Sequence, residues 1–189
     1  MMRIQSMIYG LLVGALILSS CQKEEQDPFA IDTNRVGVLT SETQIKALDS
    51  LFPNDSIVKN TGGTEFLSAA DAIEVYEKGG AKLMIITPQE AANPKSTIES
   101  IQLIDSRYMT ASGVSPASTF KTIKDAYPIS KINNTLSTAV VFLDTIQAYF
   151  TIDKKELPAK FRSGTDAEIT ANDIPDTAAI KHFWIQWDK

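Results

Sequence analysis

Few side chains in this sequence have the type and the spacing needed for covalent or acid–base chemistry. The chain has one cysteine, Cys21, whose thiol is a nucleophile, and one histidine, His182, whose imidazole titrates near neutral pH. Ser118 and Lys121 are three residues apart, a spacing at which a helix places a lysine amine beside the serine hydroxyl that it activates. The acidic residues are scattered without a metal-ligand spacing, so we expect no metal and no cofactor.

Cys21 follows a segment with the layout of a secretory signal. Arg3 supplies the positive charge, residues 7–18 are apolar, and small residues precede the cysteine. The apolar run is shorter than the roughly 20 residues that a membrane-spanning helix needs. Residues 18–21, Leu-Ser-Ser-Cys, resemble the lipobox of bacterial lipoproteins, in which the thiol is acylated and the chain is cut before the cysteine. The sequence therefore predicts a signal peptide over residues 1–20 and lipid attachment at Cys21, with an ordinary secreted protein as the alternative.

The segment after the cysteine predicts a tether. Residues 21–34 contain a polar, mostly acidic stretch that cannot bury enough apolar surface to fold alone. Position 22 is not aspartate, which resembles lipoproteins released to the outer membrane. Lys23, Glu24 and Glu25 resemble a surface-export signal of one group of Gram-negative bacteria, with a solvated linker as the alternative. We expect a lipid-anchored protein of the outer membrane, on its periplasmic face or at the cell surface.

Charge and length limit the classes of partner. The chain has 18 basic and 23 acidic residues and a formal charge of −5, and removal of residues 1–20 takes away only Arg3 among the charged residues. An acidic chain without a basic patch disfavours nucleic acid, whose binding depends on lysine and arginine. The remaining length fits one globular domain, which we assign to residues 35–189.

Hydrophobic patterning predicts an α+β domain around a mostly antiparallel sheet of about eight or nine strands. We expect these strands at residues 35–39, 57–59, 71–77, 82–87, 98–104, 129–132, 138–143, 147–152 and 180–187. Of two main helices, one opens at a capping box in residues 41–44 and the other is capped by Ser118. Gly79 and Gly80 predict a hairpin turn, and the apolar run at residues 83–86 predicts a strand covered on both faces.

The last predicted strand carries aromatic side chains on both faces. Alternation places His182, Trp184 and Gln186 on one face and Phe183 and Trp187 on the other. At most one tryptophan can therefore lie in a one-sided core, and the other covers a second layer or forms part of a binding surface. For His182 we favour a partly exposed strand position over a catalytic or metal-binding role.

Ser118 and Lys121 also have a simpler interpretation than catalysis. Ser-x-x-Lys occurs in serine β-lactamases and penicillin-binding proteins, and residues 162–165 resemble their third motif. No Ser-Asp-Asn sequence lies between the two motifs, and the chain is too short for that fold. A serine cap followed by a helix with Lys121 facing outward explains the same residues. A serine hydrolase or acyl-transfer enzyme using Ser118 and Lys121 is therefore the alternative hypothesis.

Four segments together resemble a known family. Residues 37–40, 98–101, 110–114 and 180–187 occur in this order in a small family of uncharacterised outer-membrane lipoproteins, one member of which belongs to the envelope-stress (sigma-E) regulon of enteric bacteria. The resemblance spans nearly the whole predicted domain. It implies a single compact domain on a lipid anchor, without an established activity.

These observations favour a non-enzymatic binding or structural module. We expect it to contact the membrane through N-terminal acyl chains and to act on an envelope protein, a glycan or a small ligand. A small-ligand carrier is a further alternative, which would require a deep apolar pocket between sheet and helices.

Overall fold

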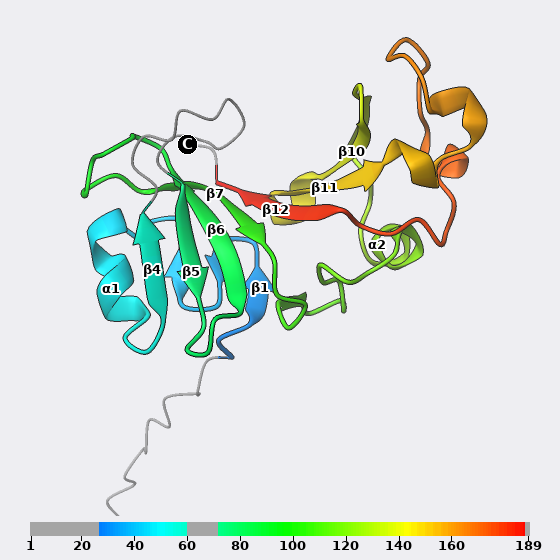
Figure 1. Cartoon of the computed structure of the whole chain (residues 1–189). Helices are drawn as coiled ribbons and strands as arrows, with labels where there is room; N and C mark the ends of the chain where they lie inside the picture. Colours follow the sequence, from blue (N-terminus) through cyan, green and yellow to red (C-terminus); the bar gives the residue numbers. More distant parts are fainter. Residues whose placement is uncertain (1–26, 60–71, 188–189) are drawn as a thin grey trace, which may run out of the picture.

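The computed structural model describes residues 27–59 and 72–187, which form two sheets and two short α-helices (Figure 1). The helices are α1 (Leu48–Leu51) and α2 (Phe120–Ala126). One sheet has eight antiparallel strands and the other has four short ones. The α+β class and the mostly antiparallel sheet predicted from the sequence are thereby confirmed.

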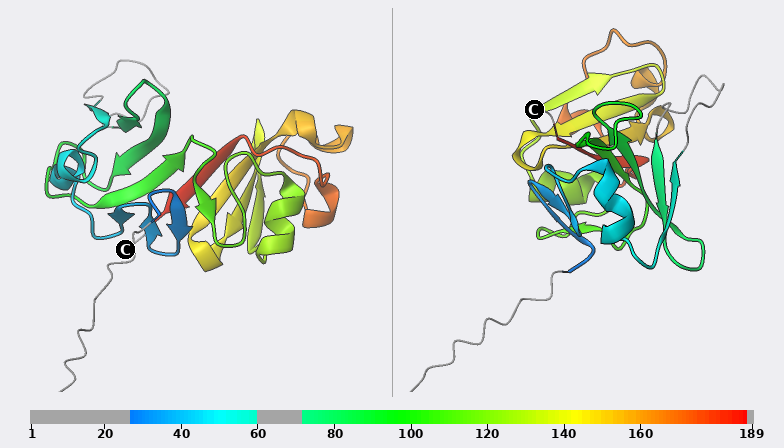
Figure 2. Two further views of the ribbon diagram at one scale, coloured as in Figure 1. Left: turned by 90° about the horizontal axis from the view of Figure 1, so that it is seen from below. Right: turned by 90° about the vertical axis from the view of Figure 1, so that its left-hand side faces the viewer.

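The eight-stranded sheet is built from strands that the sequence predicted, but the order of these strands in the sheet could not be predicted from the sequence. From one edge to the other the strands are β4 (Ser56–Lys59), β5 (Ile73–Tyr76), β6 (Lys82–Pro88), β7 (Ile98–Leu103), β12 (His182–Gln186), β11 (Ala148–Asp153), β10 (Thr138–Leu143) and β9 (Lys131–Asn134). The C-terminal strand β12 thus lies in the middle, between β7 and β11. Strand β12 links the half of the molecule that contains α1 to the half that contains α2. The molecule is longest in the direction that joins these two halves (Figure 2).

The four-stranded sheet combines three short strands near the start of the described chain with one short strand from residues 109–110. Its order is β3 (Leu39–Thr40), β2 (Arg35–Val36), β1 (Ala30–Asp32) and β8 (Met109–Thr110), with β1 and β8 parallel. The strand predicted at residues 35–39 is divided by Gly37, whose φ of +55° turns the chain and where a Cβ atom would overlap the carbonyl oxygen of Pro28. Strand β1 lies inside residues 21–34, which the sequence predicted to be a tether. Because Ile31 in this strand is buried, residues 30–32 belong to the folded domain and not to a tether.

Both hydrophobic clusters cover the same face of the eight-stranded sheet. One cross-strand row of buried side chains runs through the registers of six strands: Val75, Met84, Leu103, Phe183, Phe150 and Val141. One cluster contains residues of the four-stranded sheet and of α1, and the other contains Phe120 of α2 and Phe161 of the 3-10 helix η4 (Ala159–Phe161). The remaining 3-10 helices are η1 (Ile45–Ala47), η2 (Asp144–Ile146), η3 (Lys154–Glu156) and η5 (Ala171–Asp173).

Neither predicted helix cap forms. The first helical segment starts with η1, and Gln44 precedes it without a side-chain cap. The N–H groups of Ile45 and Lys46 instead donate to the backbone oxygens of Ser96 and Pro94, each at 2.9 Å. These donors, which a helix N-terminus normally leaves for a cap, are already satisfied by a distant loop.

Helix α2 begins one residue later than predicted, for the same reason. Its N-cap is Thr119, not Ser118, and the N–H groups of Phe120 and Lys121 donate to the carbonyl oxygens of Ala178 and Asp176 at 2.8 and 3.0 Å. Among the described residues, no helix combines the length and the apolar composition needed to cross a bilayer.

Candidate binding surface

The face of the eight-stranded sheet opposite the two hydrophobic clusters, which we call the open face, carries a second cross-strand row. Its members lie directly opposite one another on six neighbouring strands, and each is partly exposed: Glu74, Ile85, Gln102, Trp184, Tyr149 and Phe142. We call these six residues the open-face row. The prediction that residues 83–86 are covered on both faces is wrong at Ile85, which belongs to this row. An antiparallel sheet with one buried and one solvated face explains the arrangement.

Three consecutive members of the row are aromatic and their rings touch. The ring centroids of Phe142 and Tyr149 are 5.7 Å apart, and those of Tyr149 and Trp184 are 5.8 Å apart with nearly parallel planes, 9°. Such pairs stabilise each other beyond the area that they bury. Partial burial raises the pKa of the Tyr149 hydroxyl, with Glu99 adding to the effect, so Tyr149 is neutral and a hydrogen-bond donor at neutral pH. Trp187, by contrast, is buried in the opposite face, as the alternation predicted.

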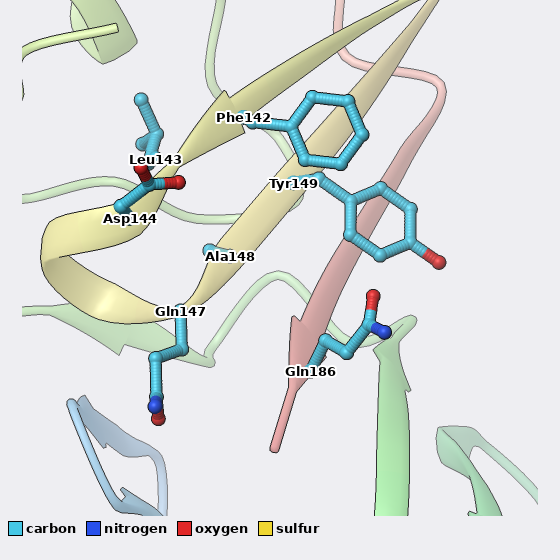
Figure 3. Close-up of a pocket in the computed structure, with 7 residues that line it drawn as sticks. All are labelled: Phe142, Leu143, Asp144, Gln147, Ala148, Tyr149 and Gln186. Carbon is cyan, nitrogen blue, oxygen red and sulfur yellow. The ribbon is translucent and has the colours of Figure 1, made fainter. Parts of the chain in front are cut away.

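A pocket of about 330 Å³ adjoins the aromatic rings at the ends of β10 and β11 (Figure 3). Its lining residues are Phe142, Leu143, Asp144, Gln147, Ala148, Tyr149 and Gln186. The two rings lie side by side, and the amide of Gln186 points toward Tyr149 (Figure 3). The side chain of Gln147 points away from the rings and lines another part of the wall (Figure 3). Aromatic carbon, amides and one carboxylate therefore surround this space, without a lysine or arginine among the lining residues.

Two polar side chains near the row have an unpaired buried atom. Within the described chain, Oε1 of Gln147 and Oγ1 of Thr151 are buried without a hydrogen-bond partner. Gln147 also has a left-handed backbone conformation, with φ 50° and ψ 45°, which is uncommon for a residue other than glycine. Unpaired buried atoms and uncommon backbone conformations each cost free energy and are concentrated at functional sites.

His182 lies beside the row on β12 and is held as a hydrogen-bond acceptor. Its Nδ1 is 2.9 Å from Nε2 of Gln102, whose amide group donates. Burial, with Lys181 as the second cause, lowers the pKa of the imidazole below its ordinary value of 6.5. His182 is therefore neutral at pH 7. Its side chain is partly exposed on β12, as expected from the sequence.

We expect the imidazole resonances of His182 to titrate with a midpoint below 6.5 in the folded protein. Because the pKa is lowered in the folded state, the folded protein binds fewer protons than the unfolded protein at pH values between the two pKa values. The free energy of unfolding therefore falls as the pH falls through 6.5 toward the folded-state pKa. NMR can measure the titration without assignment, since the chain has one histidine. The same sample in urea is the control, with a midpoint near 6.5; a folded midpoint at or above that value would contradict the prediction.

The structure places Ser118 and Lys121 in separate interactions. Oγ of Ser118 accepts a hydrogen bond from the N–H of Ser115 at 3.0 Å, and Nζ of Lys121 donates to Asp125 at 2.5 Å. No hydrogen bond joins the two side chains in the described chain. The bond to Asp125 raises the pKa of the Lys121 amine, whereas a lysine that activates serine needs a lowered pKa.

The remaining predicted site residues, Cys21, Lys23, Glu24 and Glu25, lie outside the described residues. Within residues 27–59 and 72–187, no group of three or more histidine, cysteine or acidic side chains gathers as metal ligands do. The open face brings together three aromatic side chains and several hydrogen-bonding groups.

Comparison with known proteins identifies a protein with a similar fold but does not identify an activity. No protein-family model and no curated protein matches the sequence. Among solved structures, the chain is similar to the uncharacterized protein yfeY from Escherichia coli, with a TM-score of 0.53, 14% sequence identity, and coverage of 84% of this chain and 99% of that one. At this identity the likeness concerns the fold alone. The chain therefore has the same kind of α+β fold as an uncharacterized bacterial protein.

Proposed function

We propose that this protein is a non-enzymatic binding module held at the outer membrane by lipid on Cys21, and that the open face is its binding surface. The observation that carries the proposal is the open-face row: three touching aromatic side chains remain partly exposed in the middle of an eight-stranded sheet whose opposite face is fully used by the core. Exposed aromatic groups that gather on one surface are typical of interaction sites.

The sequence supports the location that we propose. The signal segment, the cysteine and the polar residues after it fit a protein exported and then anchored by acyl chains. Such an anchor leaves the domain facing the envelope space or the outside of the cell, where ligands are envelope proteins, glycans or small molecules. The pairing of Lys121 with Asp125 supports a non-enzymatic role over the acyl-transfer alternative.

Hydroxyl-radical footprinting tests the proposal in intact cells. We expect Tyr149 and Trp184 to react less with radicals in cells than in the purified protein, because a bound partner shields the open face. Met109 is the matched control, since it is 46% exposed and lies in the four-stranded sheet, away from the open face. Mass spectrometry of the oxidised peptides gives each ratio, and normalisation to Met109 corrects for radical scavenging by the cell.

The footprinting experiment can either support or contradict the proposed binding surface. Protection of Tyr149 and Trp184 with unchanged Met109 supports a binding surface on the open face. Equal reactivity of all three residues in cells and in solution would contradict it, because the open face would then be as free in the envelope as in the purified protein.

A further inference from the structure

The chemistry of the open-face row indicates which class of ligand it binds. The faces and edges of Phe142, Tyr149 and Trp184 form a continuous apolar strip across three strands. Next to this strip are hydrogen-bonding groups without charge: Gln102 and His182 on one side and Gln186 at the pocket. A pyranose ring has the complementary pattern, with apolar C–H faces and a rim of hydroxyl groups.

The charges around the strip select against other ligands that stack on aromatic rings. Asp144 lines the pocket, and no lysine or arginine does. Nucleic acids also stack on aromatic side chains, but their binding requires cations for the phosphates. The charged residues in register with the row, Lys131 on β9 and Glu74 on β5, lie at its two ends and have opposite signs. The central part therefore fits an uncharged ligand.

The pocket adds a polar wall and a size that suit one sugar unit. Its wall includes Gln186, whose side-chain amide points toward Tyr149 and is a group that can both donate and accept hydrogen bonds. With a volume of about 330 Å³, the pocket is at the small end of ligand sites and suits one sugar unit better than a large cofactor.

We propose that the open-face row binds a neutral oligosaccharide, with pyranose rings against Tyr149 and Trp184 and a terminal sugar in the pocket beside Gln186. This inference rests on the proposed binding function of the open face and assigns its ligand class. Peptides that extend a sheet bind at its edges, here β4 and β9, and not across the middle of its face.

The test is a titration of the full chain, purified in a detergent without a sugar headgroup. The probes are the hexasaccharides maltohexaose, cellohexaose, chitohexaose and laminarihexaose, with a heparin hexasaccharide as the anionic comparison. Tryptophan fluorescence reports on binding, because Trp184 lies in the row while the other tryptophan, Trp187, is buried. We expect at least one neutral probe to bind saturably at millimolar concentrations or below, and the heparin probe not to bind.

Variants assign the binding to the row. Tyr149→Ala and Trp184→Phe should weaken binding of the neutral probe, Tyr149→Ala by at least about tenfold. Tyr127→Ala is the matched control: Tyr127 is also partly buried, but it packs against the first hydrophobic cluster. We expect this variant to bind within about twofold of the unchanged protein, measured by isothermal titration calorimetry, with circular dichroism verifying the fold of each variant.

The outcomes separate this inference from the proposed function. Absence of binding to every neutral probe, or binding unaffected by Tyr149→Ala, would overturn the oligosaccharide assignment; so would a preference for heparin. If footprinting still shows protection of Tyr149 and Trp184 in cells, the open face remains a binding surface for another partner. Without that protection, the proposed function fails as well.

Discussion

Replacing Phe183 with alanine should lower the free energy of unfolding by about 3–5 kcal/mol, the usual cost of removing a buried phenylalanine. Phe183 is completely buried in β12, and its ring centroid is 4.2 Å from that of Phe150. It lies at the middle of the buried cross-strand row, between Leu103 and Phe150. Because Phe183 lies between buried side chains on both neighbouring strands, its removal leaves a cavity in the core, which adds to the loss of stability.

Urea unfolding followed by circular dichroism measures this loss. A domain of ordinary stability has about 5–15 kcal/mol in total, so Phe183→Ala removes a large part of it. In thermal unfolding the expected fall in Tm is roughly 6–20 °C, at about 2–4 °C per kcal/mol for a chain of this length.

Phe142→Ala is the matched control, because it is the same substitution on the other face of the same sheet. Phe142 is partly exposed and its main ring contact is Tyr149, so we expect a loss of only about 0.5–1.5 kcal/mol from that aromatic pair, plus a modest term for the partly buried area. Equal losses at the two positions would show that both faces of the sheet are packed alike, and would contradict the open face.

The strands of the eight-stranded sheet could be predicted because their signals are local. The alternation of side chains along a strand correctly predicted on which face of the sheet His182, Trp184 and Trp187 lie. Two glycines correctly predicted the turn between β5 and β6. The order of the strands is not local. Since β12 inserts between β7 and β11, Trp184 meets Tyr149 only in the folded sheet, and the aromatic part of the row could not be recognised in the sequence.

The parts that the sequence predicted wrongly depend on contacts between distant segments. Ser41 and Ser118 looked like helix caps, yet backbone carbonyl groups from residues 94–96 and 176–178 take the N–H groups that a cap would bind. Strand β1 was missed inside the predicted tether because three residues give too short a pattern, and one of its two pairing partners, β8, lies far along the chain. The open-face residue Tyr149 carried a usable signal, because it is an aromatic residue in phase with the polar Thr151 and Asp153 on an alternating strand.

Replacing Cys21 with serine should release the protein from the membrane. We expect acylation to require the thiol, and the chain has no second cysteine that could substitute for it. Each buried methylene of an acyl chain contributes about 0.8 kcal/mol, so several chains hold the protein essentially permanently, whereas the variant keeps none. Palmitate labelling should disappear, and the protein should move from the membrane pellet to the soluble envelope fraction or remain as an uncleaved precursor.

The control for this prediction is Gln26→Ser, a polar substitution five positions further along the chain, which should leave labelling and sedimentation unchanged. Labelling of the Cys21→Ser variant, or its retention as a processed protein in the pellet after an alkaline wash, would contradict the lipid anchor. Because the anchor and the open face are separate parts of the chain, the released Cys21→Ser variant should still bind the same oligosaccharide with an unchanged Kd. A released variant that binds normally would show that the acyl chains set the location of the domain and the sheet face sets its ligand.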